Sequence, residues 1–179
     1  MRCPLLCGAA VAMVSSAASA DVVITLTNFT ANAFQFSQAV APGAVTGTLT
    51  GVSVSATLLS SSAFTYADDL CVYVDVLPLS LNGLVQVGGF SDLGAQQRYL
   101  WPSGSSDAIG TVVLGEVSFA SGIDMSIPNL AVWIGNGYGA TGASGTWSGT
   151  ITLHGVNAIP APGAIALLAL AGFVSRRRR

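Results

Sequence analysis

The chain has 179 residues, of which 51% are hydrophobic and only 8% charged, and its formal net charge is −2. Between residues 21 and 158, Arg98 is the only basic residue against eight acidic ones, so the net charge there is 1 − 8 = −7. This balance excludes a nucleic-acid-binding surface and charge-driven docking to anionic lipid, both of which need clusters of Lys and Arg. The high apolar content excludes an intrinsically disordered chain.

The first twenty residues have the layout of a secretory signal peptide. Arg2 supplies a positive n-region, residues 3–14 form an apolar h-region, and Ala18-Ser19-Ala20 is an A-x-A cleavage site just before Asp21. We therefore expect export through the Sec machinery and cleavage by signal peptidase between Ala20 and Asp21.

Alternation of apolar and polar residues predicts β-strands throughout residues 21–158. It is clearest at 52–58, 70–76 and 147–153, where one face of each strand is apolar and the other polar, as in antiparallel sheets that face water on one side. Further strands are expected at 22–27, 34–36, 84–87, 111–119 and 130–134, separated by Gly-, Asn- and Pro-containing turns. About eight strands, with no sustained 3.6-residue stripe, predict an all-β fold: an antiparallel β-sandwich, either plain or of the jelly-roll type.

Aromatic residues in and beside the loops are the candidate ligand-binding residues. The segments 92–106 and 136–145 have the character of edge or loop elements, and they contain Trp101 and Tyr138. Trp133 lies in the expected strand at 130–134, where it faces outward or lies under a partly covered outer face. Carbohydrate-binding modules stack sugars on exposed rings, so Trp101, Trp133 and Tyr138 are the candidates for such a site. Trp147 is on an inward register and is expected in the core.

Catalytic chemistry is not indicated. His154 is the only histidine and occupies an outward position late in a strand. A catalytic triad needs this base, a nucleophile and a carboxylate brought together, and the sequence shows no such arrangement. We therefore expect no enzymatic activity and interpret His154 as a solvated strand residue.

The adjacent carboxylates Asp68 and Asp69 are weak candidates for calcium ligands, because Ca²⁺ prefers hard oxygen donors. No EF-hand or nonapeptide spacing accompanies them. The alternative is that the pair opens a strand and that one carboxylate accepts turn amides. No other cofactor is expected.

The C-terminal segment 159–179 has three parts. The Pro-rich segment Pro160-Ala161-Pro162-Gly163 precedes an apolar stretch at 164–174, and the chain ends in Arg176, Arg177, Arg178 and Arg179. Arginines after an apolar segment stay on the cytoplasmic side of a bilayer. The apolar stretch of about 11 residues is short against the roughly 20 of a spanning helix. We expect a short apolar helix that holds the chain transiently until the Pro-rich hinge is cut, or else a retained short anchor.

This order of Pro-rich motif, short apolar helix and Arg cluster resembles the PEP-CTERM sorting signal of bacterial exported proteins. The family motif is Pro-Glu-Pro, and Pro160-Ala161-Pro162 is a Pro-Ala-Pro variant of it. The resemblance covers residues 159–179. It implies recognition by an exosortase, a membrane protease, and cleavage near Pro160-Ala161-Pro162-Gly163.

The predicted organisation is a signal peptide at 1–20, a β-sandwich domain at 21–158 and a sorting signal at 159–179. The expected protein is exported to the cell surface or extracellular matrix, with a structural or adhesive role and a transient membrane anchor. A carbohydrate-binding module, with an extracellular polysaccharide as partner, is the alternative. A secreted hydrolase is a more distant one.

Overall fold

A computed structural model describes residues 21–77 and 79–159, which form an all-β domain. The predicted signal peptide and the sorting signal beyond Ile159 lie outside the described residues. Apart from a 3₁₀ turn, η1 (Ala67–Asp69), the regular elements of these residues are strands. They are β1 (Val22–Asn32), β2 (Phe36–Val40), β3 (Val45–Ser62), β4 (Leu70–Val76), β5 (Val85–Val87), β6 (Gln97–Tyr99), β7 (Val112–Asp124), β8 (Leu130–Asn136) and β9 (Ser144–Ala158).

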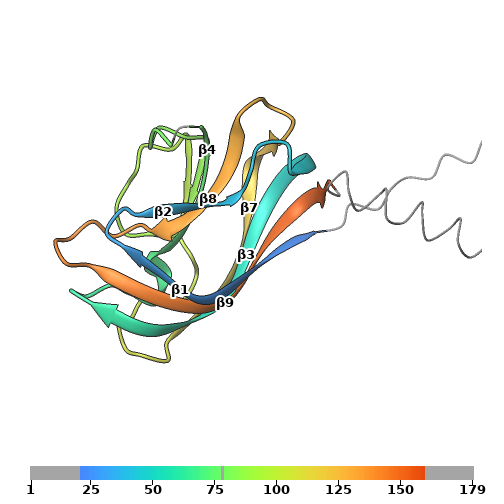
Figure 1. The fold of residues 1–179 in the computed structure, drawn as a ribbon. Coiled ribbons are helices and arrows are strands. Elements are labelled where there is room, and N and C mark those ends of the chain that lie inside the picture. The colour runs from blue at the N-terminus through green and yellow to red at the C-terminus, as the bar shows by residue number, and fades with distance from the viewer. Residues whose placement is uncertain (1–20, 78, 160–179) are drawn as a thin grey trace, which may run out of the picture.

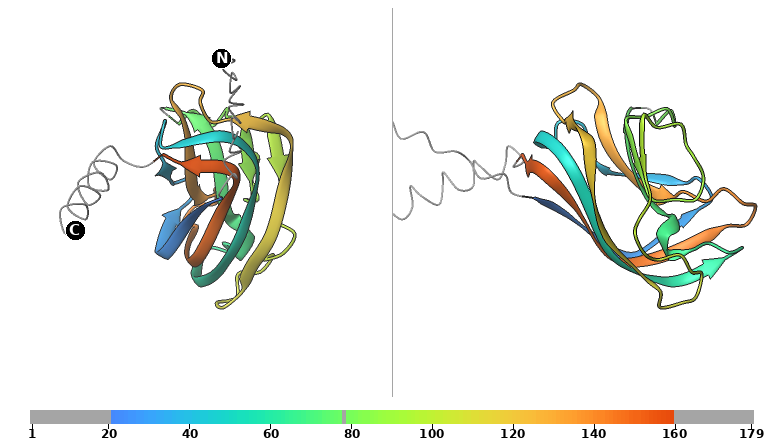
Figure 2. Two further views of the ribbon diagram at one scale, coloured as in Figure 1. Left: turned by 90° about the vertical axis from the view of Figure 1, so that its right-hand side faces the viewer. Right: turned by 180° about the vertical axis from the view of Figure 1, so that it is seen from behind.

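The strands form two sheets that face each other, the arrangement of a β-sandwich (Figure 1). One sheet has the order β1-β9-β3-β7 and the other β2-β8-β4-β5-β6. Every pairing is antiparallel except that of β5 with β6. The start of β1 and the end of β9 lie at the same end of the domain (Figure 2), because Val22 pairs with Leu153.

The core lies between the two sheets and follows the predicted alternation. In the first sheet, Val52 pairs with Leu153 and Leu58 with Trp147, and all four side chains are fully buried. Their neighbours along β3, such as Ser53, face outward. The prediction that Trp147 belongs to the core is confirmed.

The outer face of β4 is covered, so the prediction from the sequence that this face is exposed to solvent is wrong. Cys71, Tyr73 and Asp75 are buried, because the segment 79–95 folds back over them. The Tyr73 hydroxyl donates to Leu93 O at 2.9 Å and accepts from Gly83 N–H at 2.9 Å. These bonds fasten the covering segment to the strand.

Two strands differ from the predicted pattern. The expected strand at 34–36 is instead β2, Phe36–Val40, because Phe34 has φ +52° and lies in the turn that precedes it. β6 falls inside the expected loop at 92–106. Its three residues carry no alternation signal, and they are a strand because Val85 and Val87 of β5 pair with them.

Candidate functional site

A groove of about 590 Å³ opens at one end of the sandwich. Its walls come from η1, the turn after β3, the strand β6, and the segments that follow β5, β6 and β8. Phe90 and Phe64 are 76% and 74% exposed although they line this groove. The Tyr138 ring meets the Phe90 ring edge-on, with centroids 5.9 Å apart. The groove therefore presents open aromatic faces to solvent.

The loop that carries Phe90 is held in place by buried polar contacts. Gln86 is fully buried, and its amide donates to Gly88 O at 3.1 Å and Ser91 O at 2.8 Å. Gly88 has φ +79°, and a Cβ at this position would collide with the Trp101 indole and Leu70 O. Glycine is required here, because it alone combines this backbone conformation with so close an approach.

Charged and hydroxyl groups lie at the edges of the aromatic surface. The Ser105 hydroxyl donates to Asp68 Oδ2 at 2.6 Å. Arg98, the only Lys or Arg between residues 21 and 159, donates from Nη2 to Phe90 O at 2.8 Å. The groove thus combines stacking surfaces with a carboxylate, a hydroxyl and a guanidinium, which can hydrogen-bond to a ligand's polar groups.

Asp69 is the buried acid among the residues that line the groove, with only 4% of its surface exposed. Its Oδ2 accepts from Tyr66 N–H at 2.8 Å and its Oδ1 from Phe90 N–H at 3.0 Å. Burial raises the pKa of Asp69 to about 6, outweighing these two amide bonds, which lower it. Asp69 joins η1 to the Phe90 loop and so sets the shape of the groove.

The structure brings two of the three predicted ligand-binding aromatics to this groove. Tyr138 lies on its wall, as a candidate should. Trp101 also lines it but is buried to 5% exposure, with its indole N–H donating to Leu70 O at 2.7 Å, so its expected role as an exposed platform is wrong. Trp133 lies elsewhere, half-buried against the outer face of β4. Phe64 and Phe90 were not identified from the sequence as candidate binding residues. The signal that could have identified them is a bulky apolar residue in or beside a turn.

The weak calcium assignment of Asp68 and Asp69 gains no support from the geometry. Both carboxylate oxygens of Asp69 accept backbone amides, which is the alternative weighed from the sequence. Within residues 21–77 and 79–159, no group of three or more His, Cys, Asp or Glu residues could hold a metal ion.

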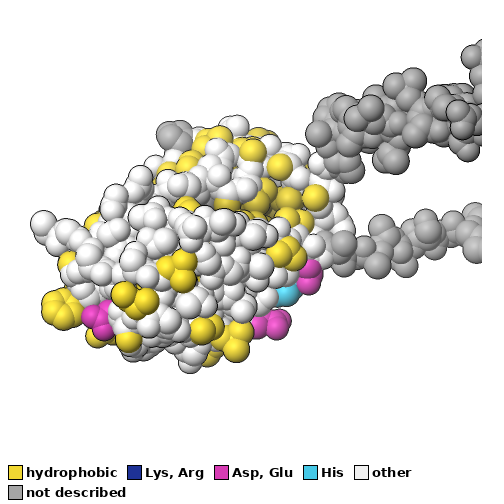
Figure 3. Space-filling model, turned by 60° about the horizontal axis from the view of Figure 1, so that its bottom comes forward, with side chains coloured by type: hydrophobic (Ala, Val, Ile, Leu, Met, Phe, Trp, Pro, Cys, Tyr) yellow, Lys and Arg dark blue, Asp and Glu magenta, His cyan; other side chains and the backbone are white. Residues whose placement is uncertain are grey.

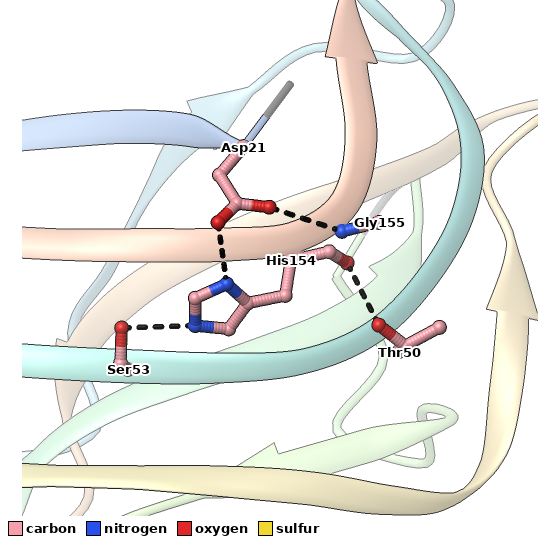
Figure 4. A network of polar contacts seen from close by, with 5 residues as sticks. All are labelled: Asp21, Thr50, Ser53, His154 and Gly155. Carbon is pink, nitrogen blue, oxygen red and sulfur yellow. Dashed lines mark hydrogen bonds and ion pairs between the residues drawn. The ribbon is translucent and has the colours of Figure 1, made fainter. Parts of the chain in front are cut away.

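A second polar arrangement lies on the outer face of the first sheet, near the start of β1. His154 Nδ1 is 2.8 Å from Asp21 Oδ2, and His154 Nε2 is 3.0 Å from Ser53 Oγ (Figure 4). The interpretation of His154 as a simply solvated residue is therefore wrong, since both ring nitrogens have protein partners. The hydrogen bond from His154 lowers the pKa of Asp21.

The fold and the groove define a class of protein: a two-sheet all-β domain with an aromatic-lined groove among the loops at one end. No family model, curated protein or solved structure matches the chain. Among the described residues, no helix has both the length and the apolar character that crossing a membrane requires.

Proposed function

We propose that this chain is an exported surface or extracellular-matrix protein that acts adhesively, by binding a neutral polysaccharide in the aromatic groove. The observation that carries the proposal is the exposure of Phe64 and Phe90 beside Tyr138 in a groove edged by Asp68 and Arg98. Exposed apolar surface that gathers in a groove is typical of binding sites. Sugars match this mixture, because their C–H faces stack on rings while their hydroxyls bond to carboxylate and guanidinium groups.

The position of the groove supports display at a surface. In the pairing of β3 with β9, Val45 meets Ala158 at one end of the sandwich and Ser62 meets Ser144 at the other. Ser62 at the end of β3 and Ala158 at the end of β9 lie at opposite ends of the sandwich (Figure 1), and the groove is lined from Phe64 onward, just beyond Ser62. The predicted sorting signal follows Ala158 in the sequence. A domain tethered through its C-terminal segment would therefore direct the groove away from the membrane.

The sandwich is of the jelly-roll type in this proposal. With β6 set aside, the two sheet orders β1-β9-β3-β7 and β2-β8-β4-β5 support this topology, in which most successive strands alternate between the sheets. Lectin domains use the same architecture, which is an analogy of fold and not of site.

Replacing Phe90 by alanine is expected to weaken polysaccharide binding by about 5- to 30-fold, the equivalent of about 1–2 kcal/mol for a lost aromatic contact. Binding is measured with the full chain on a glycan array and then by calorimetry on the glycan retained. Ile109→Ala is the matched control, because Ile109 is 73% exposed but does not line the groove. Equal loss in both variants, or no glycan bound by the unaltered chain, would contradict the proposal.

For the sorting signal, deletion of Arg176–Arg179 is expected to leave the C-terminal segment uncut, because nothing then stops it on the cytoplasmic side. The measurement is the size of the exported chain, by mass spectrometry, in a host with an exosortase-like protease. Replacing the four arginines by lysines is the control, since it keeps the positive charge and should preserve processing. Normal processing of the deletion variant would refute the sorting model.

A further inference from the structure

The arrangement around His154 has the connectivity of a nucleophile, a base and an orienting acid. Asp21 immediately precedes β1, Ser53 is on β3, and His154 is on β9, the strand between them. The carboxylate contacts Nδ1 at 2.8 Å and the hydroxyl contacts Nε2 at 3.0 Å, so the two ring nitrogens have different partners (Figure 4). With Nδ1–H donating to Asp21, Nε2 is free to accept the Ser53 proton.

Further bonds fix these groups. Gly155 N–H donates to the second oxygen of Asp21 at 3.4 Å, and the Thr50 hydroxyl donates to His154 O at 3.3 Å. The side chain of His154 is 23% exposed, which leaves the ring partly shielded but still accessible. Ser53 and His154 on neighbouring strands, and Asp21 directly before β1, are thus held in one relative geometry by hydrogen bonds and strand register, as a catalytic constellation requires.

A depression of about 370 Å³ lies directly beside Ser53 on the same outer face. Ser53 pairs with Thr152 on β9 and with Glu116 on β7, and both line this depression. Leu114 and Ser55 form its next row. A small molecule can therefore rest against Leu114 with its polar end at Ser53.

We propose that this chain is also a hydrolase of small neutral esters, with Ser53 as nucleophile, His154 as general base and Asp21 as positioning residue. This activity is independent of the aromatic groove, which opens beyond the end of β3 and shares no lining residue with the depression beside Ser53. From the sequence, a secreted hydrolase was only a distant alternative, and this proposal assigns its catalytic residues.

The reaction balances without a cofactor. Ser53 Oγ attacks the ester carbonyl as His154 Nε2 takes its proton, and the proton passes to the leaving alcohol when the C–O bond breaks. Water, deprotonated by the same nitrogen, then attacks the acyl-serine and releases the carboxylic acid. Thr152 and Ser55 line the same depression, and we assign their hydroxyls as the donors to the developing oxyanion.

The charge around the depression selects the substrate class. Glu116 lies opposite Ser53, and Asp21 lies on the other side of His154. Figure 3 shows the single histidine beside acidic side chains, with no Lys or Arg side chain visible on that face. An anionic ester would be repelled, whereas a neutral ester with a short acyl chain fits.

The test uses the full chain, with 4-nitrophenyl acetate as substrate and a fluorophosphonate as covalent probe. Ser53→Ala and His154→Ala are expected to lower kcat/KM at least about 100-fold. Ser37→Ala, a serine on the other sheet, is expected to keep the full rate. Mass spectrometry should locate the phosphonyl adduct on Ser53, and the anionic ester 4-nitrophenyl hemisuccinate should react more slowly than the acetate.

Asp21→Asn separates positioning from folding. It should lower kcat and alter the pH–rate profile with an unchanged melting temperature, which a merely structural contact would not do. Hydrolysis by the unaltered chain no faster than by Ser53→Ala, or an adduct absent from Ser53, overturns the proposal. All the substituted side chains are exposed or half-buried, so none of the substitutions empties the core, and the melting temperature of each variant verifies that it folds.

Discussion

Replacing Trp147 by alanine is expected to lower the free energy of unfolding by about 3–5 kcal/mol, the usual cost of removing a fully buried aromatic side chain. Trp147 is completely buried between the two sheets, and its indole N–H donates to Ala67 O at 3.0 Å. The variant therefore leaves a cavity and also deprives a buried carbonyl of its donor. Because domains are stable by about 5–15 kcal/mol, this is a large fraction of the total.

Trp133→Ala is the matched comparison, with an expected loss of about 1–2 kcal/mol. Trp133 is only half-buried, and its indole N–H meets no acceptor among the described residues. Unfolding in urea should be followed by circular dichroism, because each variant alters the fluorescence. Trp147→Phe, which keeps most of the volume, keeps the test informative if the alanine variant does not fold. Equal losses at the two positions would contradict the assignment of the core.

Local patterns in the sequence were enough to predict most of the strands, because a period of two records which side chains face the core. They could not predict the covered face of β4. The alternation in β4 puts Tyr73 on the outer face of the sheet. Tyr73 is nevertheless buried, because the segment around Leu93, twenty residues further along the chain, covers it. β6 was missed for a related reason: it is defined by pairing with β5 and not by any pattern of its own.

The candidate sites depended still more on long-range geometry. Tyr138 could be predicted as a loop residue because it lies in a Gly-rich segment. Phe64 could not be predicted as a groove residue, because its position depends on a backbone with φ +62°, a conformation that phenylalanine rarely adopts. Asp21 and Ser53 are 133 and 101 residues from His154. They meet only through the register of three strands, which the sequence alone does not give. The predicted signal cleavage, before Asp21, retains the carboxylate of this arrangement.

Asp69→Ala is expected to destabilise the domain by about 2–4 kcal/mol, because the amides of Tyr66 and Phe90 both lose their acceptor. The loss should also open the groove, since the same carboxylate joins η1 to the Phe90 loop. Glycan binding by this variant is therefore expected to fall together with its stability. The exposed Asp107→Ala is the control and should change neither property.

The pH dependence of this effect follows from the raised pKa. The folded domain keeps the Asp69 proton up to about pH 6, whereas the unfolded chain releases it near the ordinary value of 3.8. Between these values the folded state binds more protons, so the contribution of Asp69 to stability falls as the pH rises from about 4 to 6 and then levels off. Asp69→Asn cannot ionise and lacks this dependence. The stability difference between the unaltered chain and Asp69→Asn, measured by urea unfolding, should therefore be larger at pH 4.5 than at pH 7. The opposite trend would mean that the two amide bonds outweigh burial and that the carboxylate is ionised throughout this range.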